Sequence, residues 1–466
     1  MIFLFLFLPF SFLLYFASSN QTYRNWVLIL LSLLFYAWGE PVWISVLIVS
    51  ATVDYFHGLI VERYRGRWQS KAAVLSSLAV NLSLLGFFKY WAFFAENLGL
   101  LLGTQIPAGT FNLPIGISFY TFQTISYVID VYRGEVEAQR SFPKLLLFVS
   151  LFHQLVAGPI VRYKDIAREI EHRVITLPLF STGVSRFVCG LGKKVIFANT
   201  AGEVAEIFLN GRIDQLPVLG AWFGITMFAF QIYFDFSGYS DMAIGLGKMF
   251  GFTYKENFNY PYTATSATDF WRRWHMSLGS FFRDYVYIPL GGNQTHHSRN
   301  LFVVWFLTGL WHGASWNFVV WGLYYGLLIM IEKLVLFPLM KRLPAVLSHI
   351  YLLAAMLVGW VFFYYTDLSQ AMKLLAVMFG LTGQPLTDTE LVIHLTNNFA
   401  FLVLAAIAST PLVSHLFRRL TAWATENRLQ PVVMQYAWSA WNFVTFAVST
   451  ALLVGKSYNP FLYFRF

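Results

Sequence analysis

Long apolar runs separated by short polar loops extend along the whole chain. A helix needs about 20 apolar residues to cross a bilayer, and some of these runs are shorter. We therefore predict an all-α, polytopic integral membrane protein with roughly 10–12 transmembrane helices plus re-entrant and amphipathic helices. No repeat or long hydrophilic stretch interrupts the pattern, which favours a single membrane domain over residues 1–466. The runs lie near residues 1–18, 26–38, 41–61, 72–94, 113–131, 142–160, 176–208, 217–234, 237–252, 301–331, 345–364, 371–382, 391–409 and 435–454.

The run from Leu301 to Ile331 contains no Asp, Glu, Lys or Arg. At about 1.5 Å per residue, a helix of this length exceeds the roughly 30 Å hydrocarbon core. The run is predicted to span the bilayer, either steeply tilted or broken near Gly309 and Gly313. On a continuous helix His312 would lie near the middle depth of the membrane, where an ionisable group marks a functional site by default. The alternative is a neutral core histidine that is hydrogen-bonded to a neighbouring helix.

Aromatic and apolar residues recur at spacings of three and four within residues 266–293, as on one face of an amphipathic helix. Cap-type residues from Ser266 onward begin this predicted helix and Pro289 ends it. His275 shares the aromatic face. One reading is an interfacial helix whose arginines meet anionic lipid. The other is a helix that dips into the protein, where His275 faces the same cavity as His312. The face consists of Trp271, Trp274, Leu278, Phe282 and Tyr285.

Composition supports the membrane assignment. The chain is 57% hydrophobic and only 12% charged, which excludes a water-soluble globule of 466 residues. The net charge of +9 is spread over short clusters between apolar runs, so it indicates positive-inside topology and no nucleic-acid partner. Cys189 is the only cysteine, which rules out an intrachain disulfide and a Cys-rich metal site. No metal is predicted.

Several common catalytic motifs are missing from the sequence. It contains no Gly-x-Ser-x-Gly nucleophile elbow, no His-Glu-x-x-His metal motif and no phosphate-binding Gly-x4-Gly-Lys-Ser/Thr loop. Asp235 and Asp241 are six residues apart, or about 240° around a regular helix, so they form no carboxylate dyad unless Gly238 breaks the helix. They are expected instead to bond neighbouring helices or to line a polar path.

Four stretches together closely resemble the membrane-bound O-acyltransferase (MBOAT) family, in the branch of the alginate and peptidoglycan O-acetyltransferase membrane subunits. They are residues 113–134, 233–252, 269–293 and 307–326. The resemblance extends from the N-terminus to the closing PFLYFRF. It implies a helical fold around a central funnel, a cytoplasmic acetyl donor that we expect to be acetyl-CoA, and an acceptor beyond the membrane.

The resemblance also carries over site residues. The near-invariant histidine of the family falls on His312, which is expected to act as a general base or a brief acetyl carrier, and the second falls on His275, which is expected to orient the thioester. At a third position the alginate enzyme has a Pro-His pair, whereas Gln154 stands here, so His153 receives no catalytic role. Candidates for donor binding or for lining the funnel are Trp311, Asn317, Asp269, Trp271, Arg272, Arg273, Arg283, Ser237, Asp241 and Gln154.

These features predict a multi-pass O-acetyltransferase of the bacterial cytoplasmic (inner) membrane that serves the O-acetylation of peptidoglycan, alginate or another exopolysaccharide. With no soluble domain or serine-hydrolase motif in the sequence, the final transfer is expected to need a periplasmic acetyltransferase of serine-hydrolase type. One alternative is D-alanyl transfer to teichoic acid from a carrier protein. Another is a transporter or flippase without bond chemistry, although no inverted repeat is evident.

Overall fold

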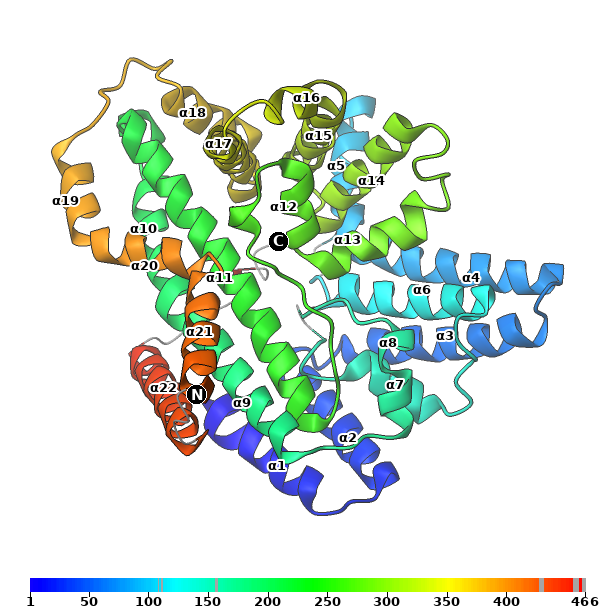
Figure 1. Cartoon of the computed structure of the whole chain (residues 1–466). Helices are drawn as coiled ribbons and strands as arrows, with labels where there is room; N and C mark the ends of the chain where they lie inside the picture. The colour runs from blue at the N-terminus through cyan, green and yellow to red at the C-terminus, as the bar shows by residue number, and fades with distance from the viewer. Residues whose placement is uncertain (108, 110–111, 156–157, 427–430, 456–460, 463–466) are drawn as a thin grey trace. The chain divides into compact units, whose positions relative to one another are not determined.

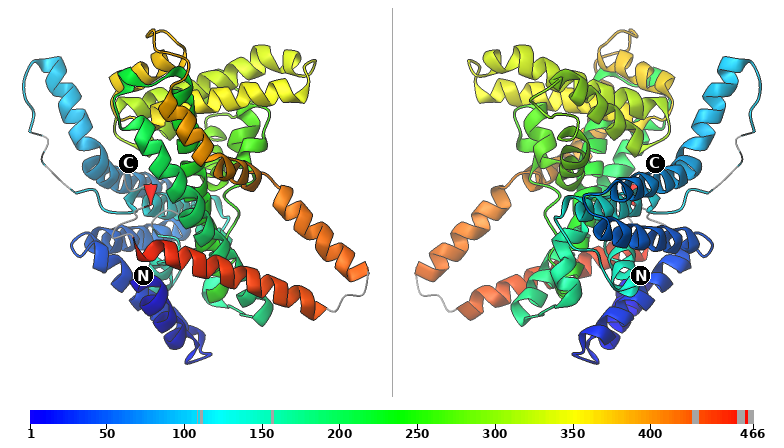
Figure 2. Two further views of the ribbon diagram at one scale, coloured as in Figure 1. Left: turned by 90° about the vertical axis from the view of Figure 1, so that its left-hand side faces the viewer. Right: turned by 90° about the vertical axis from the view of Figure 1, so that its right-hand side faces the viewer.

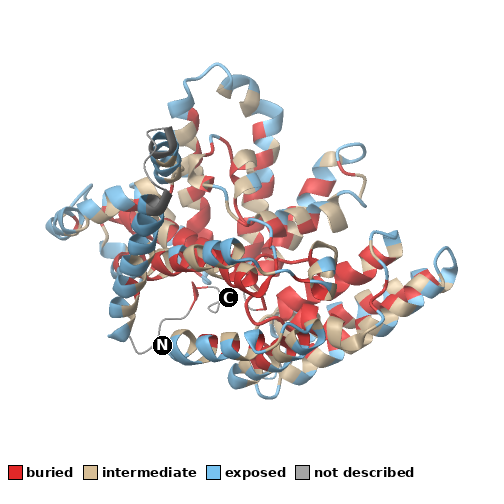
Figure 3. Cartoon of the chain, turned by 60° about the horizontal axis from the view of Figure 1, so that its bottom comes forward, coloured by how far each residue is buried: buried red, intermediate tan, exposed pale blue. Residues whose placement is uncertain are grey.

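The computed structural model describes residues 1–107, 109, 112–155, 158–426, 431–455 and 461–462, and these residues form helices, turns and loops with no strand (Figure 1). They divide into two compact units. Unit 1 contains Met1–Phe187 and Ser240–Lys255, and unit 2 contains Val188–Tyr239 and Glu256–Phe466. The predicted all-α class is confirmed. In Figure 3 the buried residues, drawn in red, follow the packed faces of the helices, and exposed residues cover the outer faces.

Two helices contribute residues to both units, namely α9 (Leu177–Gly192) and α11 (Val218–Phe250). The other helices of unit 1 are η1 (Phe3–Phe7), α1 (Leu8–Phe16), α2 (Gln21–Gly39), α3 (Ile44–Arg63), α4 (Trp68–Leu85), η2 (Gly86–Tyr90), α5 (Trp91–Leu102), α6 (Ile117–Arg133), α7 (Phe142–Ser150) and α8 (Tyr163–Glu171).

Unit 2 holds the remaining helices. They are η3 (Lys193–Ala198), α10 (Asn199–Leu209), η4 (Ile213–Gln215), η5 (Pro261–Thr263), α12 (Ala267–Arg273), α13 (Met276–Phe282), η6 (Arg283–Tyr287), α14 (His297–His312), α15 (Trp316–Ile331), η7 (Glu332–Leu336), α16 (Phe337–Met340), α17 (Ala345–Tyr364), α18 (Leu368–Met378), α19 (Thr389–Asn397), α20 (Phe399–Ala408), α21 (Leu412–Glu426) and α22 (Pro431–Val454).

Among the described residues, six helices are long and apolar enough to cross a membrane, or seven if the bent pair α19 and α20 is one span. This is fewer than the predicted ten to twelve, because several apolar runs divide into helices too short to cross alone. The run at 142–160, for example, yields the nine-residue helix α7. The six candidates are Ile44–Arg63, Trp68–Leu102, Val218–Phe250, Trp316–Met340, Ala345–Tyr364 and Gln435–Val454.

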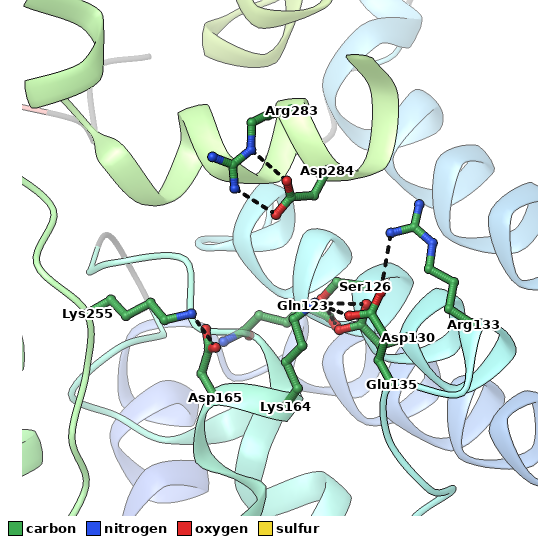
Figure 4. Close-up of polar contacts among 10 residues, drawn as sticks. All are labelled: Gln123, Ser126, Asp130, Arg133, Glu135, Lys164, Asp165, Lys255, Arg283 and Asp284. Carbon is green, nitrogen blue, oxygen red and sulfur yellow. Dashed lines mark hydrogen bonds and ion pairs between the residues drawn. The ribbon is translucent and has the colours of Figure 1, made fainter. Parts of the chain in front are cut away.

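Buried polar groups in unit 1 are paired between helices. Where α3, α4 and α6 pack together, the Asp54 carboxylate accepts hydrogen bonds from Ser77 Oγ at 2.6 Å and from Asn81 Nδ2 at 2.7 Å. At the end of α6, Lys164 lies 3.4 Å from Asp130 and 2.5 Å from Glu135 (Figure 4). Pairing of this kind offsets the cost of removing polar groups from water.

Two close-packed helices replace the single crossing predicted for Leu301–Ile331. Helix α14 ends at His312, and α15 begins at Trp316 and packs back against it; α17 packs against α15 as well (yellow-green to yellow in Figure 2). The predicted break is confirmed at Gly313, whereas α14 continues through Gly309. A Cβ at Gly313 would lie 2.3 Å from the Phe318 ring, so a larger residue there would require this ring to move.

The helix predicted within residues 266–293 is also divided. Helices α12 and α13 are separated at His275, which adopts a left-handed backbone with φ of 44°. The predicted start is confirmed, since the Ser266 side chain accepts from the Asp269 N–H at 3.1 Å. A buried carboxylate anchors the same end, because Glu332 accepts from the Ala267 N–H at 2.5 Å and from the Thr268 N–H at 2.9 Å.

The α14–α15 contact predicts unequal effects of one added methyl group. A Cβ at Gly322 would lie 2.3 Å from the Trp305 carbonyl oxygen, whereas a Cβ at Gly86 would meet nothing within 4 Å. Gly322→Ala should lower the free energy of unfolding by about 1–3 kcal/mol through overpacking. Gly86→Ala, in a helical conformation, should leave it unchanged or raise it by roughly 0.5–1 kcal/mol. Thermal unfolding of the detergent-solubilised variants measures both, and equal melting temperatures would contradict this account.

Candidate active site

A cavity in unit 2 is lined almost entirely by apolar and aromatic side chains, with one imidazole and one carboxylate. Its empty space is about 380 Å³, counting the mouth. Helices α11, α14, α15 and α17 supply most of the wall, the segment after α12 supplies a tryptophan, and two residues come from the far end of the chain. The lining residues are Ile232, Asp235, Phe236, Trp274, His312, Trp321, Trp360, Phe363, Phe461 and Leu462.

His312 is held at this wall by the end of α14. Its side chain is 5% exposed, and its ring centroid lies 4.9 Å from that of Trp321 and 5.2 Å from that of Phe363, with both ring pairs nearly perpendicular. The edges and faces of these rings therefore surround much of the imidazole with apolar side chains. The ring lies at the wall of the cavity, beside the space that a ligand could enter.

His275 is fixed by a different contact. Its Nδ1 lies 3.1 Å from Asn257 Oδ1, so Nδ1–H is the donor, and the Asn257 carbonyl also accepts from the Met276 N–H at 2.9 Å. These bonds hold the left-handed break between α12 and α13. Nε2 is buried and has no hydrogen-bond partner among the described residues. Burial lowers the pKa of His275 to about 3, so the ring is neutral.

The sequence left open whether His275 faces the same cavity as His312, and His275 is not among the residues that line that cavity. The His275 ring contacts Phe236 at a centroid distance of 4.6 Å and Trp311 at 5.9 Å. Phe236 belongs to the cavity wall, and Trp311 precedes His312 on α14. His275 therefore lies behind the rings that border the His312 cavity, and its catalytic role stays a prediction.

The predicted arginines differ in their partners. Arg273 pairs with Asp269 at 3.0 Å, and Arg283 pairs with the adjacent Asp284 at 2.7 Å (Figure 4). Arg272 is exposed and forms no ion pair with any described residue. Arg272 is therefore the arginine of this segment that is most available to an external anion.

Of the other candidates in unit 2, Trp271 is half-buried, and Asn317 and Ser237 are buried. Trp271 contacts the rings of Trp321 and Tyr325, and its indole N–H has no partner among the described residues. Asn317 donates from Nδ2 to the Phe362 carbonyl at 3.1 Å, which ties the start of α15 to α17. The Ser237 hydroxyl is buried without a partner in the part of the chain that the structure describes.

Gln154 and Asp241 belong to unit 1. Gln154 Nε2 donates to the Phe148 carbonyl at 2.7 Å, and Asp241 pairs with Arg186 at 2.6 Å. The neighbouring His153 is bonded to the Tyr254 hydroxyl at 2.8 Å. The Asp241 ion pair agrees with the expectation that this carboxylate bonds a neighbouring helix.

Sequence reasoning missed most of the wall around His312. Trp321 is 1% exposed, and its indole N–H has no partner among the described residues. Nothing in the local pattern distinguishes it from the other aromatic residues of α15. Phe461 and Leu462 lie about 150 residues beyond His312, and helical periodicity carries no information about contacts at that separation.

The fold and the cavity define a polytopic helical membrane protein with a buried imidazole. Comparison with known proteins identifies its class, because the model of the MBOAT, membrane-bound O-acyltransferase family, matches residues 14–369. The chain belongs to this family. It is therefore an O-acyltransferase, and the reading as a transporter without bond chemistry is set aside.

Curated relatives agree with this assignment. The chain is 37% identical to "Probable alginate O-acetylase AlgI" of Azotobacter vinelandii, over 100% of this chain and 99% of the relative. It is 34% identical to the peptidoglycan O-acetyltransferase of Helicobacter pylori, over 82% of this chain and 79% of that protein. The teichoic acid D-alanyltransferase of Bacillus subtilis is more distant, with 28% identity over 46% of this chain and 58% of its own length.

The buried His275 predicts a dependence of the free energy of unfolding on pH. Its pKa is about 3 in the folded protein and near 6.5 in an unfolded chain, so between these values only the unfolded chain binds the proton. The free energy of unfolding is therefore highest above pH 6.5. Well inside this window it falls by about 1.4 kcal/mol for each unit by which the pH is lowered. The stability difference between the parent and His275→Gln should shrink as the pH falls from 7 to 5. Thermal unfolding across that range tests it, and a constant difference would contradict the burial of a neutral imidazole.

Proposed function

We propose that this chain is a membrane O-acetyltransferase subunit of the bacterial cytoplasmic (inner) membrane. It takes an acetyl group from a cytoplasmic thioester, acetyl-CoA, and passes it on for O-acetylation of an extracytoplasmic polysaccharide. The observation that carries the proposal is the buried imidazole of His312 in an aromatic cavity. The relatives matched over most of their length are named for alginate and peptidoglycan O-acetylation, which supports acetyl as the transferred group.

In the proposed reaction, His312 accepts the proton of an attacking hydroxyl while the hydroxyl oxygen bonds to the acetyl carbonyl carbon. The C–S bond of the thioester then breaks, and the leaving thiolate takes the proton from the imidazolium. One alcohol and one thioester thus give one ester and one thiol. A general base placed in this way contributes about 10²–10⁴ in rate. The surrounding rings support the mechanism by excluding water, which would otherwise hydrolyse the thioester.

The donor and the final acceptor have different requirements. Arg272, exposed and without an ion pair among the described residues, is suited to a phosphate of acetyl-CoA, because a guanidinium binds phosphate oxygens in a bidentate manner. The sequence contains no Gly-x-Ser-x-Gly nucleophile elbow for the final transfer to a polysaccharide. We therefore assign delivery to the glycan to a periplasmic acetyltransferase of serine-hydrolase type that acts after this chain.

Replacement of His312 tests its role as the base. His312→Ala should reduce transfer of labelled acetyl from acetyl-CoA by at least about 10²-fold, because it removes the imidazole that accepts the proton. His415→Ala, on the exposed side of α21, is the matched control and should retain activity. Size-exclusion chromatography in detergent establishes that both variants fold. Normal acetyl transfer by a folded His312→Ala protein would refute the assignment.

Reconstitution tests the donor and the partner. Proteoliposomes that contain only this chain, with labelled acetyl-CoA on the cytoplasmic side, should leave de-O-acetylated alginate and peptidoglycan on the outside unlabelled. Adding a serine-hydrolase-type periplasmic acetyltransferase encoded beside this chain should label one of these glycans. Glycan labelling by this chain alone would remove the partner from the scheme. Dependence on an aminoacylated carrier protein in place of acetyl-CoA would indicate D-alanyl transfer.

A further inference from the structure

One charged side chain stands in the otherwise apolar wall of the His312 cavity. Asp235, on α11, is 1% exposed, and both of its carboxylate oxygens are engaged. Oδ1 lies 2.5 Å from Lys194 Nζ, and Oδ2 accepts from the backbone N–H of Leu462 at 2.6 Å. Asp235 thus connects two segments separated from it by 41 and 227 residues.

Lys194 lies in a π-helical segment of the chain. This segment, η3, continues directly from α9, and the Lys194 side chain is 15% exposed. Such π-helical turns occur frequently at functional sites, where they redirect side chains. A buried carboxylate is costly without a partner, and the Lys194 ammonium supplies that partner and holds Asp235 in place. An ionised carboxylate is also the stronger acceptor for a backbone N–H.

The residue bound by Asp235 forms part of the cavity wall. Phe461 and Leu462 are each 6% exposed, and both line the cavity beside His312. The Phe461 ring packs against Phe236 at 5.9 Å and against Tyr239 at 4.9 Å between centroids. Phe461 and Leu462 are therefore held against α11 by ring packing and by the hydrogen bond from the Leu462 N–H to the Asp235 carboxylate.

We propose that Asp235 is a positioning residue. Its carboxylate, fixed by Lys194, holds the Leu462 backbone so that Phe461 and Leu462 close the cavity beside His312 and keep water from the acyl donor. The significance of this closure rests on the proposed function, whereas the docking itself does not. Without the closure, water attacks the thioester carbonyl and the C–S bond breaks, so that acetate and thiol form in place of the ester.

The competing explanation is that Asp235 and Lys194 only join α11 to η3. Two double variants separate the alternatives, because both remove the two charges together and leave no buried ion unpaired. Asp235→Asn with Lys194→Met keeps an oxygen that can accept from the Leu462 N–H. Asp235→Leu with Lys194→Met has similar volume and no acceptor. If the ion pair only joins α11 to η3, residue 462 should be equally accessible to a labelling reagent in the two double variants.

Docking is measured directly by cysteine labelling. Cys189 is replaced by serine, and Leu462→Cys, which retains the backbone N–H, supplies the only thiol. In membranes without any donor, N-ethylmaleimide should label this thiol about tenfold faster in the Leu-containing double variant than in the Asn-containing one, through more frequent local opening. The exposed Cys189 of the parent chain gives the rate for an open thiol. Equal labelling in the two double variants would overturn the proposal.

Activity supplies the second readout, in chains with the native Leu462. The ratio of acetyl-CoA hydrolysis to acetyl transfer should be several-fold higher for the Leu-containing double variant than for the Asn-containing one. Faster labelling with an unchanged ratio would overturn the role in excluding water. If the parent chain does not use acetyl-CoA at all, the proposed function fails, while the labelling experiment still decides whether Asp235 holds Leu462.

Discussion

The contact between α14 and α15 at Gly309 and Gly322 is the constraint on which the site depends. Each glycine lies where a Cβ would fall 2.3 Å from a backbone oxygen of the other helix. This close approach places the connection at Gly313 against the Phe318 ring and fixes the end of α14, where His312 lies. Backbone packing between the two helices therefore contributes to the position of the catalytic candidate.

The aromatic rings around His312 both pack the helices together and set the environment of the cavity. Apolar side chains fill the space between helices, and their burial stabilises the fold by about 25 cal/mol per Å² of apolar surface. The same rings leave few polar groups in the cavity, which makes any charge that develops during a reaction strongly sensitive to its neighbours. Packing and chemistry are therefore coupled, and a change at Trp321 or Phe363 alters both.

Hydrophobic patterning alone predicts the helical membrane class, and the charge-free run around His312 is enough to single that residue out. Periodicity also identifies which side of residues 266–293 is buried. Periodicity predicts one continuous helix where the structure has two. The break at His275 is held by Asn257, which lies 18 residues upstream and forms no part of the periodic pattern. The partners of Asp235 escape prediction for the same reason, since contacts across 227 residues depend on the tertiary fold.

The environments of the two histidines argue for different roles. A general base works best when its pKa lies near the working pH, and the pKa of His275, lowered to about 3 by burial, is far below that range. Its Nδ1–H is committed to Asn257, and its left-handed backbone, which costs about 1–3 kcal/mol, fixes the turn between α12 and α13. That turn places Trp274 in the wall of the cavity. His275 is therefore better suited to shaping the site than to accepting a proton, which is compatible with the proposal that His312 is the base.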